Sequence, residues 1–483
     1  MLKNFNKPVI NKREWQVMNE SIHVSGAGVC VIAPEDDYCD YALSVASAGS
    51  VALYNYSGDS YELTASPSLA GTFGAGTGGI YNPWSIRYTA TAGSGNSITV
   101  SSLAFNITGY IVGKTIQIMS GSQEGFTTTV AGILTSAGQG DIIIYLKDSL
   151  PGALASGDKF RCMSGAYYVL NGGTKTAGNF KVFDLASRAW SGNLDNAALT
   201  NMTGDISFTT AYRQGEYMAE GTVGTGTSTT MTSLKSTTKH KVLATAIAPN
   251  WTVDQWKNYQ VTIKNNAGLT QTRTIVSNTA TTITVSPAFL FTPDSTCTYM
   301  IEGNEDILYL LGNNAVILYK YSISANLWTL ITPVTARTAV TGAGVTADIP
   351  TDTARPEWSD ENNIKDGRYI YSLRGIGSSN LDRYDIVTNK WEVVRWVTVE
   401  TFSTGTSTVL VNADWYIRKD NSNRFFKYNV VDNVIIPFST IALVDGVAVY
   451  GQKVHAKRIK DTNIVFLYSQ ANTSKSVYRT LVY

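Results

Sequence analysis

The sequence predicts an all-β protein, and three observations support this prediction. Helical periodicity is nearly absent from the chain of 483 residues. Short runs rich in Val, Ile, Thr, Tyr and Trp recur along the chain, for example at 97–102, 141–146 and 281–285. Gly, Asn, Ser and Asp separate these runs every ~8–12 residues, which is typical of strands joined by turns. The only helix that the sequence predicts is a single turn at 252–257.

Composition and charge exclude several classes of function. The 38 Lys and Arg residues nearly balance the 37 Asp and Glu residues, so the net charge is +1. This balance argues against an extended basic face for nucleic acid and against a polybasic membrane anchor. Hydrophobic residues make up 43% of the chain, which favours a folded core over disorder. The three histidines lie far apart in the sequence, which leaves little material for histidine-based catalysis or metal binding.

The N-terminal residues and the cysteines predict a protein that folds in a reducing cytoplasm. Residues 1–15 contain no apolar run of a secretory signal, and no run in the chain is long enough for a membrane-spanning helix. None of the four cysteines, Cys30, Cys39, Cys162 and Cys297, belongs to a CxxC pair. We therefore expect free thiols and no zinc site or redox motif.

A repeated pattern organises the chain. Three segments, 167–190, 307–328 and 369–391, contain an apolar strand that ends in Gly and then a second strand that leads to a Trp. Seven residues separate an aromatic residue from that Trp in each: Phe183 to Trp190, Tyr321 to Trp328, and Tyr384 to Trp391. The closing glycines are Gly173, Gly312 and Gly375. Degenerate copies occur at 51–61, 415–435 and 464–483, which makes six candidate repeats.

This pattern resembles the kelch repeat of β-propeller proteins. The resemblance implies a propeller of six blades, with seven as the alternative, in which each blade has four strands. It makes Trp190, Trp328 and Trp391 residues of the core between blades rather than sugar-stacking residues. The last repeat supplies only two clear strands, at 464–468 and 477–482. We expect the N-terminal strands 14–18 and 23–32 to complete that blade and close the ring.

Two insertions interrupt the repeats and resemble each other. Tyr61 and Trp190 are 129 residues apart and Trp190 and Trp328 are 138 apart, whereas only 63 residues separate Trp328 from Trp391. The segments 112–130 and 256–276 share a Thr-rich pattern, which predicts one duplicated β module. Each module continues into a strand with a cysteine, so Cys162 and Cys297 are expected at matching positions. The predicted domains are 1–97 (closing strands and first blade), 98–165 (module 1), 166–225 (a blade), 226–304 (module 2) and 305–483 (remaining blades).

The sequence offers no pattern for catalysis. Residues 74–79 match GxGxxG, but Pro83 opposes the helix that a nucleotide site needs, so we expect a glycine-rich loop. The acidic segments 35–40 and 358–363 lack the ligand spacing of a calcium loop and are expected to be solvated turns. No nucleophile, zinc or phosphate-loop motif is present in the sequence. We therefore predict no catalytic, cofactor-binding or metal-binding residues.

The two modules resemble modules in structural proteins of tailed bacteriophages. The resemblance covers 98–165 and 226–303 and is carried by low charge, Thr/Ser/Gly richness and the strands 270–275 and 282–287. It implies a non-enzymatic virion protein of the tail nozzle or neck that forms a homo-oligomeric ring and contacts other virion proteins. Such a ring would touch DNA in its channel only non-specifically. The alternatives are a receptor- or glycan-binding propeller of a phage fibre or bacterial kelch protein, and a glycan-active or kelch oxidase-like enzyme.

Overall fold

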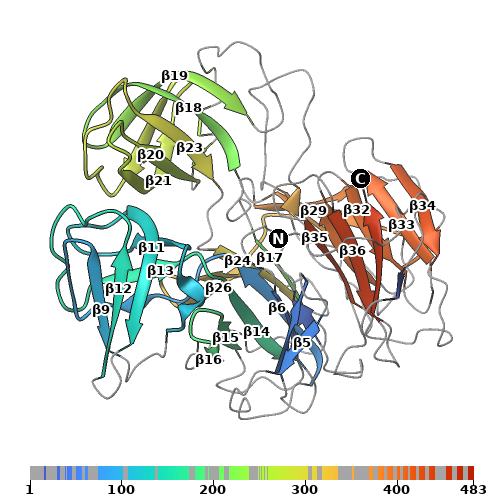
Figure 1. Cartoon of the computed structure of the whole chain (residues 1–483). Coiled ribbons are helices and arrows are strands. Elements are labelled where there is room, and N and C mark those ends of the chain that lie inside the picture. Colours follow the sequence, from blue (N-terminus) through green and yellow to red (C-terminus); the bar gives the residue numbers. More distant parts are fainter. Residues whose placement is uncertain are drawn as a thin grey trace.

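The computed structural model of the chain is all-β, as the sequence predicts (Figure 1). It describes residues 74–101, 107–135, 140–172, 180–190, 217–238, 259–302 and 318–335 as its longer continuous stretches, together with shorter pieces that contain the other strands given below. The single helix among the described residues is a 3₁₀ turn, η1 (Gly109–Ile111).

Within the described part of the chain, twenty-four strands form six antiparallel sheets of four strands each. Sheet I contains β2 (Cys30–Ile32), β3 (Tyr41–Val45), β4 (Val51–Asn55) and β5 (Ser60–Leu63). Sheet II contains β6 (Gly74–Asn82), β14 (Ala166–Gly172), β15 (Phe180–Asp184) and β16 (Ala189–Trp190). Sheet III contains β17 (Ile206–Thr210), β24 (Ile307–Gly312), β25 (Leu318–Ser322) and β26 (Leu327–Ile331).

The C-terminal part of the chain supplies the other three sheets. Sheet IV contains β27 (Thr351–Asp352), β28 (Tyr369–Leu373), β29 (Leu381–Asp385) and β30 (Lys390–Val394). Sheet V contains β31 (Ser407–Val411), β32 (Asp414–Arg418), β33 (Arg424–Asn429) and β34 (Val434–Thr440). Sheet VI contains β35 (Lys453–Arg458), β36 (Val465–Gln470), β37 (Val477–Val482) and β1 (Gln16–Val17). Each of the six repeat segments found in the sequence lies in a different sheet.

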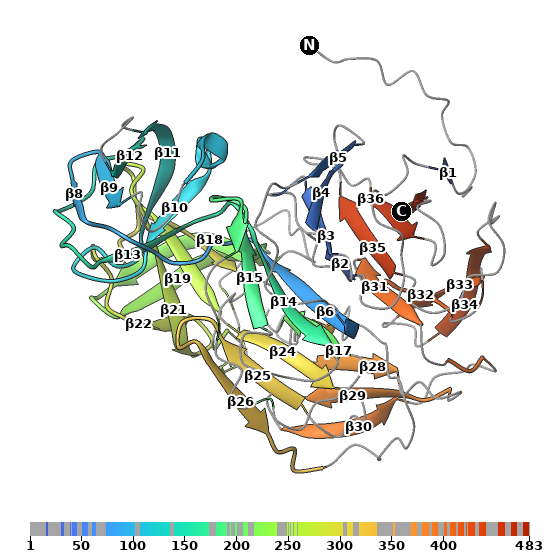
Figure 2. The same ribbon diagram turned by 90° about the horizontal axis from the view of Figure 1, so that it is seen from below.

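Consecutive sheets pack against each other through apolar side chains. One core cluster joins sheets I and II, and others join II to III, III to IV and IV to V. The first strands of the sheets also meet: β2 contacts β6, β6 contacts β17, and β35 contacts both β31 and β2. Figure 2 shows the sheets following one another around a common centre. A single sheet cannot bury both of its faces, so this succession supplies the partner that each sheet needs.

The chain ends meet in sheet VI, but differently from the expectation. Strand β1 pairs antiparallel with β37, with Gln16 opposite Arg479 and Val17 opposite Tyr478. This part of the predicted closure is confirmed. Strand β2, in contrast, pairs with β3 of sheet I, and the missing strand of sheet VI is β35. The prediction of two N-terminal strands in the last sheet is therefore wrong, because β35 pairs with β36 along its whole length and occupies that place.

The other thirteen strands form one larger sheet that folds into two barrels. Barrel 1 consists of β7 (Tyr88–Thr89), β8 (Ala92–Ser94), β9 (Ser97–Ser101), β10 (Thr115–Ile118), β11 (Phe126–Thr135), β12 (Asp141–Leu146) and β13 (Lys159–Cys162). Barrel 2 consists of β18 (Tyr217–Gly226), β19 (Thr230–Thr238), β20 (Gln260–Lys264), β21 (Thr270–Asn278), β22 (Thr282–Ser286) and β23 (Thr298–Glu302). The two barrels lie side by side in Figure 1. Barrel 1 is inserted between β6 and β14 of sheet II, and barrel 2 between β17 and β24 of sheet III.

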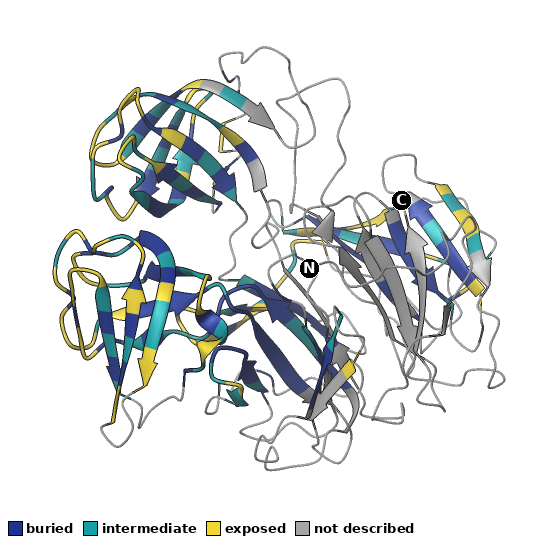
Figure 3. Ribbon diagram, in the orientation of Figure 1, coloured by how far each residue is buried: buried dark blue, intermediate teal, exposed yellow. Residues whose placement is uncertain are grey.

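Burial follows the alternation of each strand. In β9 and β22 every second residue is buried, and these residues face the inside of a barrel. Figure 3 shows the buried residues inside the barrels and sheets and the exposed ones on barrel loops. Of the predicted helical segment 252–257, the described residues 253, 254, 256 and 257 form turns: Lys257 donates its N–H to Asp254 O, and Tyr259 donates its N–H to Trp256 O. Within the described residues, no helix has the length and hydropathy of a membrane span.

Candidate functional site: the docked barrel pair

The two barrels share one strand order, which is consistent with the duplicated β module that the sequence predicts. Barrel 2 is closed, because β18, β19, β22, β21, β20 and β23 pair in turn and β23 pairs back to β18. Barrel 1 repeats this order with β9, β12, β11, β10 and β13. In barrel 1, β8 and β7 together take the place of β18, since β8 pairs with β9 and β7 with β13.

Strand register gives the residue correspondence between the barrels. Both long strands carry a β-bulge at the same place, between Val130 and Gly132 in β11 and between Ile275 and Ser277 in β21. Counting back from the bulges, Phe126 corresponds to Gln271. A bulge needs an extra residue at a defined point, so its repetition aligns the two strands residue by residue.

The register corrects the expectation for the cysteines. Cys162 of β13 lies opposite Ile116 of β10. The corresponding residue of barrel 2 is Ile301 of β23, which lies opposite Val261 of β20. Cys297 precedes β23 and corresponds to Asp158 instead. The expectation of matching positions is wrong, because Cys162 lies within β13 whereas Cys297 precedes β23. Both thiols are buried and free of disulfides, and burial raises the pKa of each.

The barrels dock by strand pairing. Phe126 lies opposite Gln271, and Thr127 opposite Thr270, in an antiparallel ladder between β11 and β21. Thr272 donates its N–H to Gly125 O at 2.8 Å, and the Thr270 hydroxyl donates to Thr127 O at 2.8 Å. Since Phe126 and Gln271 are equivalent residues that face each other, the contact has approximate two-fold symmetry.

Arg273 crosses this contact. Its Nε donates to Ala288 O at 2.7 Å and a terminal nitrogen donates to Thr272 O at 2.9 Å. Gly125 has a φ of +86°, and a Cβ atom built there would lie 1.3 Å from that terminal nitrogen. Burial lowers the pKa of Arg273 to about 10, and the nearby Glu124 carboxylate opposes this change. Burial raises the pKa of Glu124, against the pull of Arg273 and Arg87. Glu124 and Arg273 thus attract each other across the contact.

Apolar groups complete the docking surface. Leu269 and Leu290 of barrel 2 pack against the hydrophobic core of barrel 1. The Gln271 side chain fixes the loop that carries Leu290, because its oxygen accepts the Leu290 N–H at 2.6 Å and its nitrogen donates to Phe291 O at 3.0 Å. The two barrels therefore share an apolar contact as well as a strand ladder.

A buried carboxylate attaches barrel 1 to sheet II. Asp184, at the end of β15, accepts a hydrogen bond from the Tyr88 hydroxyl of β7. It also accepts the Ile86 N–H at 3.2 Å and the Ser187 N–H and hydroxyl at 3.0 and 2.9 Å. Burial raises the pKa of Asp184, and these hydrogen bonds partly offset the effect. In barrel 2 the residue that corresponds to Tyr88 is Gly221, so the same bond cannot form there.

The entry and exit of each barrel are adjacent. Ser85 donates its N–H to Cys162 O at 2.7 Å, and the Ser85 hydroxyl accepts the Cys162 N–H at 2.9 Å. In barrel 2, Tyr217 pairs with Glu302. This agrees with the expectation that the module ends lie close together. The sheet of barrel 1 also includes β7 and β8, which precede residue 98.

The repeat markers lie where two strands pair. Trp190 is opposite Phe183, Trp328 opposite Tyr321, and Trp391 opposite Tyr384. Trp328 is 3% exposed and lies in the core between sheets II and III, and Trp391, 4% exposed, lies between sheets III and IV. Trp190 is only half-buried, against the core between sheets I and II. The residue two positions before each Trp has a positive φ: Arg188, Asn326 and Asn389.

One of the three marker glycines lies within the described residues. Gly312 ends β24 opposite Ile206, while Gly173 and Gly375 lie outside the described residues. Residues 74–79 form the start of β6, paired with β14, so the expected glycine-rich loop is a strand. The reason is close packing: a Cβ at Gly79 would lie 2.3 Å from the Ile32 side chain of sheet I.

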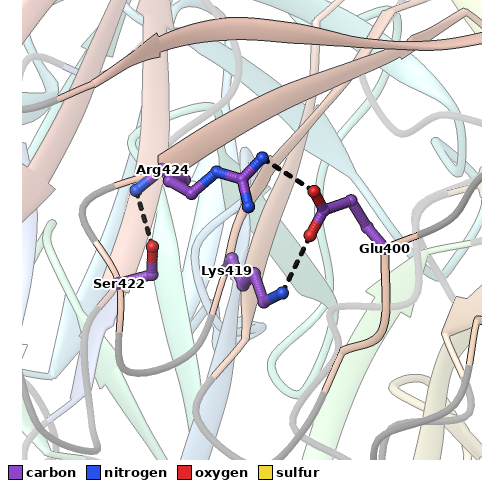
Figure 4. A network of polar contacts seen from close by, with 4 residues as sticks. All are labelled: Glu400, Lys419, Ser422 and Arg424. Carbon is purple, nitrogen blue, oxygen red and sulfur yellow. Dashed lines mark hydrogen bonds and ion pairs between the residues drawn. The ribbon is translucent and has the colours of Figure 1, made fainter.

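The remaining polar groups give no catalytic constellation. The acidic segments 35–40 and 358–363 lie outside the described residues except for Cys39. Among the residues that are described, no cluster of three His, Cys, Asp or Glu side chains could hold a metal ion. Figure 4 shows one ion network on sheet V, in which Glu400 bridges Lys419 at 2.8 Å and Arg424 at 2.7 Å. It ties the segment before β31 to the β32–β33 turn.

Comparison with known proteins adds no relative. No protein-family model matches the chain, and no curated protein matches it. The docked barrel pair is therefore the feature on which a function can be argued. The docking could not be predicted from the sequence, because no periodicity indicates that Arg273 lies over Gly125.

Proposed function

We propose that the protein is a non-enzymatic structural component of a tailed-bacteriophage particle, a ring-forming protein of the tail nozzle or neck. Its frame in this proposal is a six-bladed kelch-like β-propeller, with each four-stranded sheet as one blade. The succession of six sheets and the paired repeat markers support the propeller. The modules' resemblance to phage structural proteins supports the role in a virion.

The observation that carries the proposal is the docked barrel pair. Barrel 1 is attached to sheet II by Asp184 and barrel 2 is attached to barrel 1 by strand pairing. The chain thus carries a large projection with defined geometry and, in its described part, no cluster of metal-binding side chains. Such a projection suits a subunit that contacts several neighbours in an assembly.

The exposed apolar residues support a ring. Among the described residues, the large exposed hydrophobic side chains belong to two sets of elements, the barrels and the outer strands of sheets III to V. One group lies on the barrels and comprises Val112, Leu134, Tyr145, Leu234, Val253 and Val276. The other lies on the outer strands β26, β30 and β34 and beside them, and comprises Leu327, Leu330, Val334, Val393, Val434 and Ile436. A head-to-tail ring requires two different surfaces on each subunit.

Native mass spectrometry and negative-stain microscopy of the purified full chain test this proposal. We expect closed rings with a central channel. The double substitution Leu330→Asp and Val393→Asp should release subunits, because it puts charge on one of the two apolar surfaces. Thr329→Asp, at an exposed neighbouring position, is the control and should leave the rings intact. A chain that stays monomeric at all concentrations would contradict the proposal.

A second candidate is a receptor- or glycan-binding protein. Tyr145 is the one aromatic residue among the large exposed hydrophobic side chains of the described residues. It lies on barrel 1 opposite Gly132, and Leu134 is exposed next to that pair. Such an aromatic surface can stack on a sugar. Glycan-array binding by the monomer that Tyr145→Ala abolishes would favour this candidate.

A further inference from the structure

The docking ladder uses strand edges that each barrel leaves unpaired. Strand β12 pairs with β11 only from Val130 onward, and β22 pairs with β21 only from Thr274 onward. The starts of β11 and β21 therefore have a free edge within their own barrel, and each free edge pairs with the other. Unpaired edges expose backbone donors and acceptors and are ready templates for another strand.

We infer that this edge is a self-association surface of the barrel module, whose partner is a second copy of the same module. In this chain the edge of barrel 1 is occupied by barrel 2, and the edge of barrel 2 by barrel 1. The inference does not depend on the proposed function. It rests on the two-fold character of the contact, in which the equivalent residues Phe126 and Gln271 face each other. An isologous contact of this kind is the usual contact between two identical units.

Two residues decide which copies can pair. By register, Gly125 corresponds to Thr270 of barrel 2, and Arg273 corresponds to Thr128 of barrel 1. In the observed pair Arg273 lies over Gly125, which has no side chain to block it. A pair of two barrels 2 would place Arg273 against Thr270, and the side chains would collide. A pair of two barrels 1 would place Thr128 against Gly125 and is sterically allowed.

Barrel 2 thus prevents barrel 1 from pairing with barrel 1 of another chain. If barrel 2 were displaced, the barrel 1 edge should dimerise, whereas a displaced barrel 2 should not pair with its own kind. This asymmetry gives a sharp test, because two different ways of breaking the same contact should have different outcomes.

Thr272→Pro displaces barrel 2 and leaves the barrel 1 edge intact. The Thr272 N–H points at Gly125 O, so proline removes that bond and places its ring in the contact. Thr272→Val is the matched control, because it keeps the N–H and loses only the hydroxyl bond to Thr262. We expect faster amide exchange at 125–129 in Thr272→Pro, and an assembly mass at least twice that of the parent at the same concentration, reversible on dilution.

Gly125→Ala breaks the contact from the other side. Its methyl group meets Arg273. Gly113 has a similar φ of +81°, but a Cβ atom added there has no atom within 4 Å, so Gly113→Ala tests the backbone strain alone. Comparing the two variants separates collision from backbone strain. We expect faster amide exchange at 270–275 in Gly125→Ala than in Gly113→Ala. The mass should not increase for Gly125→Ala, because its methyl group also occupies the place that Thr128 of a second barrel 1 would take, nor for Gly113→Ala, which leaves the contact intact.

The results divide cleanly. Thr272→Pro with faster exchange but the parent's mass at every concentration would overturn the inference, as would doubling of the mass in Gly125→Ala. Equal exchange at 270–275 in Gly125→Ala and Gly113→Ala would also overturn it, and this comparison decides the matter if the proline variant does not fold. Each mass is compared with the parent's own assembly, so failure here is distinct from failure to form rings.

Discussion

Trp328 lies in the core between sheets II and III, and its truncation should strongly destabilise the packing of these two sheets. The ring centroid lies 4.9 Å from that of Tyr321 in its own sheet and 5.0 Å from that of Phe180 in sheet II. Only 3% of the residue is exposed. Trp328→Ala therefore removes the aromatic contact between two sheets and leaves a cavity.

The magnitude follows from the buried area. A buried tryptophan removes roughly 250 Å² from water, which at about 25 cal/mol per Å² corresponds to ~6 kcal/mol as an upper bound. Alanine retains part of this area and neighbours relax, so we expect a loss of about 3–5 kcal/mol in the free energy of unfolding. For a cooperative unit of roughly 150–250 residues, about 2–4 °C per kcal/mol gives a melting temperature lower by ~6–20 °C.

Differential scanning calorimetry measures this shift. The control is Thr329→Ala, whose side chain is exposed on the same strand and whose loss should stay within about 0.5 kcal/mol. Trp190→Ala should cause an intermediate loss, because Trp190 is half-buried and its ring packs on Phe183 of the same sheet, with the ring centroids 5.2 Å apart. If Trp328→Ala melts together with Thr329→Ala, Trp328 does not join the two sheets and the repeat assignment fails there.

Three further predictions use the ion network, the buried thiol and the chain ends. Hydrogen bonds and charge from Lys419 and Arg424 lower the pKa of Glu400 from 4.5, so its contribution to stability is present above that pH and is lost as the pH falls below it. The unfolding free energies of the parent and Glu400→Gln should therefore differ at pH 7 and converge in acid, and a constant difference would contradict this. Cys162 is fully buried and burial raises the pKa of its thiol, so mass spectrometry should find it unalkylated by iodoacetamide at pH 8 until barrel 1 unfolds. Removal of residues 1–17, which eliminates β1, should lower the melting temperature, whereas removal of 1–15 should not; equal melting of the two truncations would show that the β1–β37 pair does not stabilise sheet VI.

The local features of the chain were readable from the sequence. Period-two alternation predicted strands such as β9 and β22, and the seven-residue spacing predicted pairs such as Tyr384 with Trp391, because residues that flank a short turn must lie opposite each other. The similarity of 112–130 and 256–276 predicted a duplicated module, and the barrels share one strand order.

Other features depended on partners that the sequence does not indicate. Cys162 and Cys297 seemed equivalent by order, but only the register with β10 and β20 showed that they are not. Residues 74–79 read as a loop because glycine is common in loops, whereas packing against Ile32 makes glycine necessary in that strand.

The all-β class and the seven-residue spacing of the aromatic pairs could be predicted from the sequence, because both follow from local periodicity. The tertiary structure alone decided which strand closes sheet VI, how Asp184 holds barrel 1, and that Arg273 lies over Gly125. Each of these depends on backbone edges and side chains that are far apart along the chain. Their energies arise only when the elements meet, so no local pattern records them.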